Sequence, residues 1–583
     1  MKSKQTLAVI LICAMAAGVL SSCGQGSSSA SSTPAAESSS SSKVTEESSA
    51  SSEAESAEAE LPQSDIVNGE VNQQTYPIAE GLTLEFWYPQ AGSLAELADF
   101  NDSEFFKWYE ELTGIHINFI VPASGTESES FQLMFASDEM PDMVYSNPSS
   151  TGQSYRGGED KAIKDGYFID MAQYFDWAPN YVSWLVNNDD WRRAAYSDSG
   201  MMYGMCGLCV NVELGVTYAD QGMSIRKDYL DKVGLEVPTT YSEWETVLTA
   251  FKDELGIAAP LYTSKYGIDI YGDFMAGYDT APYFYQRDGQ VQFGPLDDQY
   301  RDYLTLLNDW YSRGLLDPDF ATRASGGITA DNDMILNDQV GALTDYGTRL
   351  DNTYVSRGAS NPELCYVAAP QPTKDKDDPT YVEPAYRLNN FENMLAGFYV
   401  SFSAESDHLE EAIRWCDGFY AVDVALNANY GPEEFEGTVW HYDDSTSTGR
   451  LADYDYRYSN PDGMSSGTVL VKYGMKNPPI RYMGMQIENA TPIKQAGYKI
   501  WETYEPVNAI PYRITKTSDE GTEYSSLYTD IETYVQECNV KFIMGQMNLD
   551  DYDSYRDTLR SMGIERCIEI QQAAVDRYYK RNF

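Results

Sequence analysis

The chain has 583 residues, a formal net charge of −50 at pH 7 and a hydrophobic content of 42%. Nucleic-acid binding needs clustered lysine and arginine, so this charge makes nucleic acid a poor candidate partner. The overall field also disfavours anionic ligands, although a local pocket can override it. No stretch after residue 22 approaches 18 consecutive apolar residues, so the sequence predicts no membrane-spanning helix there.

The first 22 residues have the features of a secretory signal peptide. Lys2 and Lys4 supply positive charge, and residues 7–20 form an apolar stretch too short to span a bilayer. The sequence Leu20-Ser21-Ser22-Cys23 resembles the bacterial lipobox. This resemblance implies that Cys23 becomes a lipidated N-terminus, which anchors the protein to the outer face of the cytoplasmic membrane.

A polar linker is expected over residues 23–64. Residues 24–60 are almost all Ser, Ala, Glu and Gly, which cannot form a hydrophobic core and should be disordered. A coil of this length has an r.m.s. reach of about 35 Å. The globular part should begin near Asp65.

The remaining residues, about 520, are more than one core usually holds, so we expect at least two lobes. The composition is rich in aromatic residues, with 46 Tyr and 10 Trp.

Six cysteines follow Cys23 and are scattered through the chain: Cys206, Cys209, Cys365, Cys416, Cys538 and Cys567. This spacing does not indicate a disulfide framework. Cys206 and Cys209 form a C-x-x-C pair, but a zinc ribbon would need a second pair. We therefore expect buried thiols, no metal and no cofactor.

Alternating strands and helices open the globular part. Residues 81–89 predict a buried strand, residues 95–114 a helix that ends at Gly114, and residues 115–122 a second strand. A helix over 128–137 and a strand over 141–146 follow. Because such alternation implies right-handed crossovers, it predicts a parallel sheet in an α/β fold.

Side chains just past the carboxyl ends of parallel strands line a ligand crevice. In this sequence those side chains are Trp87, Tyr88, Tyr145, Ser146 and Asn147.

A helix is predicted after Thr240, whose spacing to Glu243 indicates a capping box. Apolar residues then recur at helical spacing, and three further helices are expected near the carboxyl terminus. Their apolar stripes are Ile531, Tyr534, Val535 and Cys538; Tyr552, Tyr555, Leu559 and Met562; and Ile568, Val575 and Tyr578.

The chain resembles the family 1 extracellular solute-binding proteins of bacterial ABC importers, and in particular their large lipoprotein branch in Gram-positive bacteria. Five stretches carry the resemblance in order: YFIDMAQYFDWAPN (167–180), SIRKDYLDKVGLEVPTTYSEW (224–244), WYSRGLLDPDF (310–320), NDQVGAL (337–343) and residues 539–578. The second of these stretches is the most specific.

The resemblance implies an α/β, two-lobe, periplasmic-binding-protein-like (type II) fold with hinge crossings. The solute-binding domain would span 65–583, with a first lobe of about 65–200 and 395–430. The second lobe would take about 205–390 and most of 431–583. Crossings are expected near MMYGMCG (201–207) and NMLAGFYVSFS (393–403).

The implied function is capture of a carbohydrate, most often an oligosaccharide, and its delivery to the permease subunits of an ABC importer. Lobe closure would hold the ligand, because contacts with both lobes form only in the closed state. We expect a monomer. The alternatives are a peptide or another small polar solute as ligand, and a surface glycan-binding protein that is not coupled to transport.

Sugars need aromatic rings for their apolar faces and polar groups for their hydroxyls. The candidate ligand-binding residues are Trp87, Tyr145, Tyr203, Arg226, Asp279, Tyr346, Arg349 and Trp440. The stretch that holds Arg226 has a second interpretation, in which it caps a helix of the second lobe.

We do not expect an enzyme. The sequence has no G-x-S-x-G and no H-E-x-x-H, and its three histidines lie in no catalytic pattern. A glycoside hydrolase would need two positioned carboxylates, and pairs by spacing carry no information among 90 acidic residues.

Overall fold

The computed structural model describes residues 64–581, apart from 96, 138, 148–152, 211–220, 324–331, 384–394, 442–456, 459–465, 483–490, 502–508 and 512. The predicted signal peptide, Cys23 and nearly all of the linker therefore lie outside the described residues. No helix among the described residues is long and apolar enough to cross a membrane.

A six-stranded sheet forms the first part of the fold, with strand order β14-β4-β11-β3-β1-β2. Its strands are β1 (Leu82–Trp87), β2 (Ile115–Ile120), β3 (Met143–Ser146), β4 (Met205–Val210), β11 (Leu395–Phe402) and β14 (Ile480–Tyr482). Strand β1 pairs in parallel with both β2 and β3, as the strand–helix alternation predicts. Strand β11 runs antiparallel between β3 and β4, and β14 is parallel to β4.

The helices associated with this sheet are α1 (Glu104–Thr113), α2 (Glu127–Ser137), α3 (Glu159–Lys164), α4 (Pro179–Leu185), α5 (Asp189–Ala195), α11 (Leu409–Gly418), α12 (Val422–Tyr430) and α13 (Ser466–Tyr473). The prediction that the first helix begins near residue 95 was wrong. Asp99 caps a separate 3-10 turn, and Ser103 is extended, so α1 begins only at Glu104. Gly114 ends α1 as predicted, with φ of 73°.

A four-stranded sheet forms the second part, with strand order β10-β5-β9-β6. Its strands are β5 (Gln221–Arg226), β6 (Ala259–Leu261), β9 (Val340–Tyr346) and β10 (Tyr366–Ala368). The helices in this part are α6 (Lys227–Val233), α7 (Tyr241–Asp253), α8 (Asp298–Ser312), α9 (Asn332–Leu336), α10 (Thr353–Ser356) and α15 (Pro492–Trp501). The predicted capping box of Thr240 and Glu243 is present at the start of α7.

Three helices end the chain: α16 (Ser518–Ile543), α17 (Tyr552–Ser561) and α18 (Ile564–Tyr578). Most of their predicted apolar stripes pack into or against the core of the four-stranded sheet, whereas Tyr578 joins the core of the six-stranded sheet. Two small hairpins complete the described elements: β7 (Phe284–Arg287) with β8 (Gln290–Phe293), and β12 (Trp440–His441) with β13 (Arg457–Tyr458).

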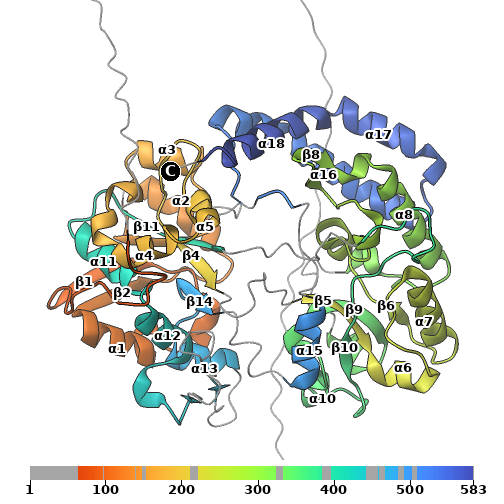
Figure 1. The fold of residues 1–583 in the computed structure, drawn as a ribbon, viewed down its shortest axis with the longest axis horizontal. Helices are drawn as coiled ribbons and strands as arrows, with labels where there is room; N and C mark the ends of the chain where they lie inside the picture. The colour runs from red at the N-terminus through yellow and green to blue at the C-terminus, as the bar shows by residue number, and fades with distance from the viewer. Residues whose placement is uncertain are drawn as a thin grey trace, which may run out of the picture. The chain divides into compact units, whose positions relative to one another are not determined.

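Each large sheet has its own hydrophobic core. Figure 1 shows β5, β6, β9 and β10 gathered together, with α15 beside β10. The chain leaves the six-stranded sheet after β4 and returns to it at β11. The predicted crossing at 201–207 overlaps β4, and the one at 393–403 overlaps β11.

The exact lobe boundaries stay a prediction. The first-lobe range 395–430 contains β11, α11 and α12, whose buried residues belong to the core of the six-stranded sheet. Most of 431–583 is expected in the second lobe. Two elements in this range belong instead with the six-stranded sheet: α13 contacts α1 and α12, and β14 is one of the sheet's strands.

The six described cysteines are free thiols. Cys206, Cys416, Cys538 and Cys567 are buried, and Cys209 and Cys365 are partly buried. Burial raises the pKa of Cys206 to about 11, although its sulfur contacts the Tyr181 hydroxyl at 3.1 Å. Burial likewise raises the pKa of Cys567 to about 11.

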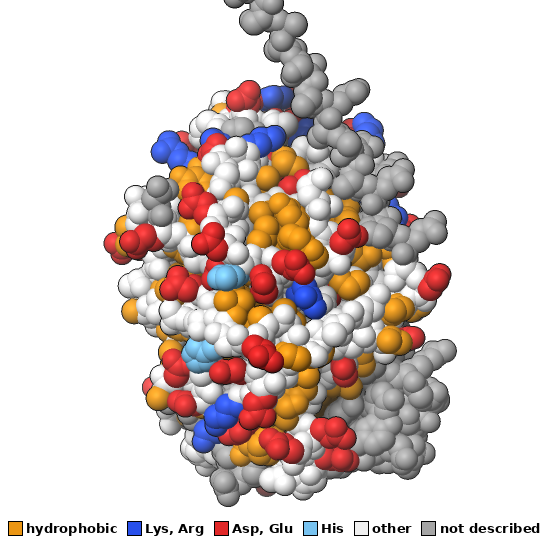
Figure 2. Space-filling model, turned by 90° about the vertical axis from the view of Figure 1, so that its left-hand side faces the viewer, with side chains coloured by type: hydrophobic (Ala, Val, Ile, Leu, Met, Phe, Trp, Pro, Cys, Tyr) orange, Lys and Arg blue, Asp and Glu red, His pale blue; other side chains and the backbone are white. Residues whose placement is uncertain are grey.

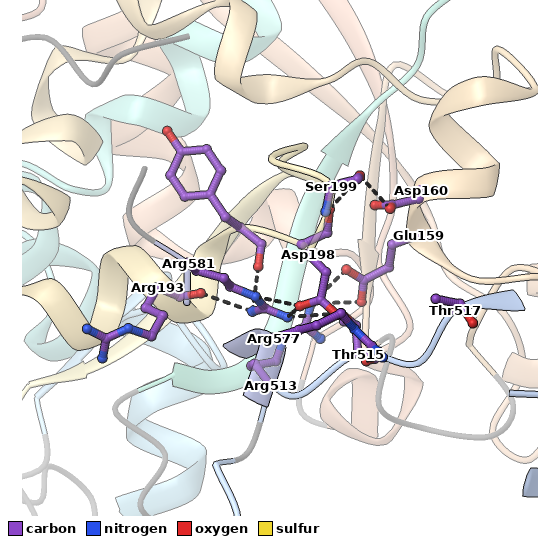
Figure 3. A network of polar contacts seen from close by, with 12 residues as sticks. Glu159, Asp160, Arg193, Asp198, Ser199, Arg513, Thr515, Thr517, Arg577 and Arg581 are labelled. Carbon is purple, nitrogen blue, oxygen red and sulfur yellow. Dashed lines mark hydrogen bonds and ion pairs between the residues drawn. The ribbon is translucent and has the colours of Figure 1, made fainter. Parts of the chain in front are cut away.

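A network of ion pairs joins the carboxyl-terminal segment to residues 159–199 (Figure 3). The Asp198 carboxylate accepts hydrogen bonds from Arg577 at 2.7 Å and from Arg581 at 2.8 and 2.5 Å. Arg581 also donates to the carbonyls of Arg193 and Tyr196. Because α18 packs on the second core and Tyr196 belongs to the first, the network links elements of the two cores.

A second ion pair lies in the same network. The Arg513 guanidinium donates to both oxygens of Glu159 at 2.7 Å, and its side chain is 7% exposed. Both contacts come from one guanidinium nitrogen, and hydrogen bonds between charged groups are stronger than those between neutral groups.

We expect Asp198→Ala to destabilise the fold by about 3 kcal/mol, because it leaves two arginines without their shared carboxylate in a partly buried site. The Arg581 side chain is only 1% exposed, so water cannot replace the lost partner. Urea unfolding followed by circular dichroism measures the change.

The matched control is Asp189→Ala, which removes an ion pair with Arg192 at a carboxylate that is 72% exposed. This variant should stay within about 0.5 kcal/mol of the parent. Equal losses from the two variants would contradict a stabilising role for the network.

Candidate ligand-binding site

The carboxyl-terminal edge of the four-stranded sheet gathers polar and aromatic side chains. Strand β9 ends at Tyr346, β6 runs parallel to β9, and β5 runs antiparallel, so that Gln221 pairs with Tyr346. The segment 262–273 follows β6 at this same edge. In open α/β sheets, ligands bind outside the carboxyl ends of strands.

Three partly buried tyrosines lie together at this edge: Tyr266, Tyr271 and Tyr346. The rings of Tyr266 and Tyr271 meet edge to face, with centroids 5.0 Å apart. Burial raises the pKa of Tyr271, and the neighbouring Tyr266 and Tyr346 hydroxyls add to that rise. Aromatic surface and hydroxyl groups are therefore presented side by side.

Asp345 orients the end of β9. Its carboxylate accepts from Arg349 at 2.7 Å, from the Tyr354 hydroxyl at 2.6 Å and from the Tyr346 backbone at 2.8 Å. The Arg349 guanidinium lies 5.2 Å from the Tyr346 ring centroid. Burial raises the pKa of Asp345 against the opposing effect of Arg349. One buried carboxylate thus positions both Tyr346 and Arg349.

Helix α15 packs closely on this edge. The Trp501 indole donates to the carbonyls of Met223 at 3.3 Å and Ala369 at 3.2 Å. A Cβ atom at Gly222 would lie 2.4 Å from the Trp501 ring, and one at Gly347 would lie 2.3 Å from Tyr498. Glycine at both positions is therefore required for the contact between α15 and the sheet.

Two buried carboxyl groups lie behind the tyrosines. Asp273 accepts from the hydroxyls of Thr263 at 2.7 Å and Thr344 at 2.8 Å. Asp269 accepts from the Asn539 amide at 2.8 Å, and its second oxygen has no hydrogen-bond partner in the described part of the chain. Burial raises the pKa of Asp269 to about 7.

The corresponding edge of the six-stranded sheet is also aromatic. The Tyr145 ring stacks on Phe398 of β11, with centroids 4.4 Å apart and an interplanar angle of 21°. The Tyr88 hydroxyl donates to the backbone carbonyl of Lys476, and the Asn477 amide contacts Gln90 at 3.5 Å. The segment that leads into β14 therefore borders Tyr145.

The structure brings two of the predicted site residues together, Tyr346 and Arg349. Trp87, Tyr145 and Tyr203 are 1%, 5% and 3% exposed, in the core of the six-stranded sheet. The Trp87 indole donates to Ser130 and packs on Phe131. In this conformation these three side chains are packing residues, and their contact with a ligand stays a prediction.

The other three predicted residues lie elsewhere. Arg226 is fully buried, stands at the N-cap position of α6 and pairs with Asp228 and Asp338, which fits the interpretation of its stretch as a helix cap. Asp279 pairs with Arg287 at the β7–β8 hairpin, and Trp440 packs in a small separate cluster. Their predicted ligand contacts also remain untested.

Sequence reasoning missed Tyr266, Tyr271 and Trp501. The first two lie within the tyrosine-rich stretch YTSKYGIDIYGD. A turn of π-helix spans Gly267–Tyr271, so it begins directly after Tyr266 and ends at Tyr271. No periodic pattern marks such a turn, and only the density of tyrosines there could have suggested it. Among the described residues, no group of three or more His, Cys, Asp or Glu side chains is placed to hold a metal ion.

No protein-family model matches the chain. One curated relative is the fructooligosaccharide ABC transporter substrate-binding protein FusA of Streptococcus pneumoniae, 22% identical over 86% of this chain and 92% of its own. The lipoprotein LipO of Bacillus subtilis is 25% identical over 42% of this chain and 46% of its own.

Solved structures of similar fold cover most of the chain. An extracellular solute-binding protein from Bifidobacterium longum subsp. infantis has a TM-score of 0.66 at 18% identity, over 85% of this chain and 98% of its own. The alginate-binding protein AlgQ2 has a TM-score of 0.64 at 20% identity over the same shares. The FusA complex with kestose has 0.63 at 17% identity, over 86% and 100%. These likenesses show the two-lobe α/β fold of solute-binding proteins and confirm the predicted fold class.

Asp269→Asn should change the pH dependence of stability. Because the folded pKa is raised to about 7, the contribution of Asp269 to stability is fully present below the pKa of the unfolded chain and is lost as the pH rises through 7. The variant has no carboxyl group to ionise, so its advantage over the parent should grow by roughly 1.4 kcal/mol per pH unit between about pH 4 and pH 7 and level off above pH 7.

Urea unfolding between pH 5 and pH 9 measures this difference. Asp302→Asn, at an exposed position on α8, is the control and should keep a constant difference from the parent. A constant difference for Asp269→Asn would mean that the buried carboxyl does not titrate in this range.

Proposed function

We propose that this protein captures an oligosaccharide by lobe closure and delivers it to the permease of an ABC importer. The observation that carries the proposal is the group of Tyr266, Tyr271 and Tyr346 beside Arg349 at the carboxyl edge of the four-stranded sheet. Tyrosine rings pack on the apolar faces of sugar rings, and arginine donates to hydroxyl oxygens.

The relatives support the same proposal. FusA is by name a fructooligosaccharide-binding component of an ABC transporter, and its similarity to this chain extends over most of both proteins. FusA and AlgQ2 are by name binding proteins, which supports a non-catalytic role. Capture would stabilise the closed state by the ligand's higher affinity for it.

We further propose that Cys23 carries a lipid anchor and that the acidic linker tethers the binding domain outside the cytoplasmic membrane. Support comes from the lipobox-like sequence and from the name of LipO as a lipoprotein. Permease subunits would be the transport partner, and the protein would act as a monomer.

A thermal-shift screen of the purified protein against plant, host and microbial oligosaccharides tests capture, with peptides as controls. A ligand at 100 times its Kd should stabilise the folded state by about 2.7 kcal/mol. Tyr346→Ala should then weaken binding by about 1.5 kcal/mol, roughly tenfold, through loss of aromatic contact.

The control for that variant is Tyr579→Ala, at a residue that is 51% exposed just beyond the end of α18. It should bind like the parent. A rise in melting temperature with peptides alone would replace the sugar by a peptide ligand, and an unchanged affinity of Tyr346→Ala would remove that edge from the site.

Cys23→Ala should release the protein from the membrane fraction into the medium, because diacylglyceryl transfer needs the cysteine sulfur. Cell fractionation followed by immunoblotting measures the distribution, with Cys365→Ala as the control that keeps the thiol of the lipobox. Retention of Cys23→Ala in membranes would exclude the lipid anchor.

A further inference from the structure

The segment 474–482 is fastened along the six-stranded sheet. The carbonyl of Gly474 accepts from Ser103 at 2.8 Å, and the carbonyl of Pro479 accepts from the Leu208 backbone at 2.6 Å. Strand β14 then pairs in parallel with β4, which sets Arg481 opposite Cys209. Arg481 therefore lies where β3, β4 and β14 all end, at the edge where ligands bind in such sheets.

Arg481 differs in its partners from the other buried and partly buried arginines that the structure describes. It is partly buried and forms no ion pair within the described ranges. Every other buried or partly buried arginine in those ranges pairs with a carboxylate. In a chain with 90 acidic and 40 basic residues, a carboxylate partner is readily supplied, so its absence at Arg481 calls for a specific explanation.

A second cation lies close to Arg481. Burial lowers the pKa of Lys476, and the positive charge of Arg481 lowers it further. The Lys476 ammonium likewise forms no ion pair with a described carboxylate, and its backbone carbonyl is held by the Tyr88 hydroxyl. Two like charges are thus held near each other and partly removed from water, which costs free energy unless an anion joins them.

Aromatic rings border the two cations. Burial raises the pKa of Tyr145, and the charge of Arg481 and a hydrogen bond from Asn477 act in the opposite direction, so both groups lie near its hydroxyl. Tyr145 stacks on Phe398. Figure 2 shows carboxylates spread over one face of the molecule, in keeping with the formal net charge of −50. Two neighbouring cations beside aromatic rings are therefore opposite in sign to the net charge of the chain.

We propose that Arg481 and Lys476 bind an anionic group, a carboxylate or a sulfate, carried by the oligosaccharide ligand. This assignment rests on the proposed carbohydrate-binding function and narrows it to acidic sugars. The planar guanidinium of Arg481 matches two oxygens of a carboxylate or sulfate, and the Lys476 ammonium adds a point charge. The ligand's anion would supply the partner that the described residues do not provide.

Isothermal titration calorimetry on the purified protein tests the proposal with matched pairs of sugars. Trigalacturonate is compared with its methyl ester, and lactose sulfate with lactose; kestose and maltotriose represent neutral ligands. An acidic sugar should bind at least about tenfold more tightly than its neutral counterpart, since hydrogen bonds to charged groups carry such differences. The two pairs distinguish a carboxylate from a sulfate.

Two variants locate the effect. Arg481→Gln and Lys476→Gln should each weaken binding of the preferred acidic sugar by about tenfold to a hundredfold and leave the neutral counterpart nearly unchanged. Arg301→Gln, at an exposed position on α8, is the control and should bind like the parent. Circular dichroism and melting temperature check that each variant folds. If Arg481→Gln does not fold, Lys476→Gln alone tests the proposal.

The outcomes separate this inference from the proposed function. Neutral sugars that bind as tightly as acidic ones would overturn the inference and leave carbohydrate capture standing. The same conclusion would follow if both variants kept the parent's preference for the acidic sugar. Failure of every sugar, acidic or neutral, would overturn carbohydrate capture itself and the inference with it.

Discussion

The ion pairs around Asp198 are the constraint on which the arrangement of the chain depends. The polypeptide passes from one sheet to the other more than once, so each core is built from segments that are far apart in sequence. Arg577 and Arg581 bring the last helix to residues of the first core, and Arg513 adds an ion pair with Glu159. Because these arginines are largely shielded from water, the network holds its geometry only while both carboxylates are present. The carboxyl terminus is thus a structural part of both halves.

Tyrosine has a consistent role in the interior, which explains its abundance. Buried tyrosine hydroxyls donate to backbone carbonyls that secondary structure leaves free, as in Tyr109 to Trp415 at 2.7 Å, Tyr303 to Asp273 at 2.7 Å and Tyr420 to Cys206 at 2.7 Å. Each ring fills core volume while its hydroxyl satisfies a distant acceptor. The abundance of tyrosine therefore reflects, in part, these internal cross-connections.

The sequence was informative where periodicity and caps decide the structure. The first three strands, the helix stop at Gly114 and the capping box at Thr240 follow from local physics, and the structure contains all of them. Of the candidate site residues, Tyr346 and Arg349 lie together because they flank one turn after β9. The burial of Trp87 could not be predicted, since a strand's pattern does not say which end or face is covered by later elements. The proposal for Arg481 could not have come from the sequence, because the absence of an ion pair among the described residues is visible only once the partners of the other arginines are known.

The free thiols have a consequence for the chemistry of this protein in an oxidising environment. Oxidation and disulfide exchange proceed through the thiolate, and a pKa of about 11 leaves on the order of one thiol in ten thousand ionised at pH 7. Cys206 and Cys567 are therefore protected kinetically, by the low polarity of their surroundings, rather than by being paired. The fold can remain intact through changes in ambient redox potential, because no covalent cross-link between its described cysteines is there to be broken or reshuffled.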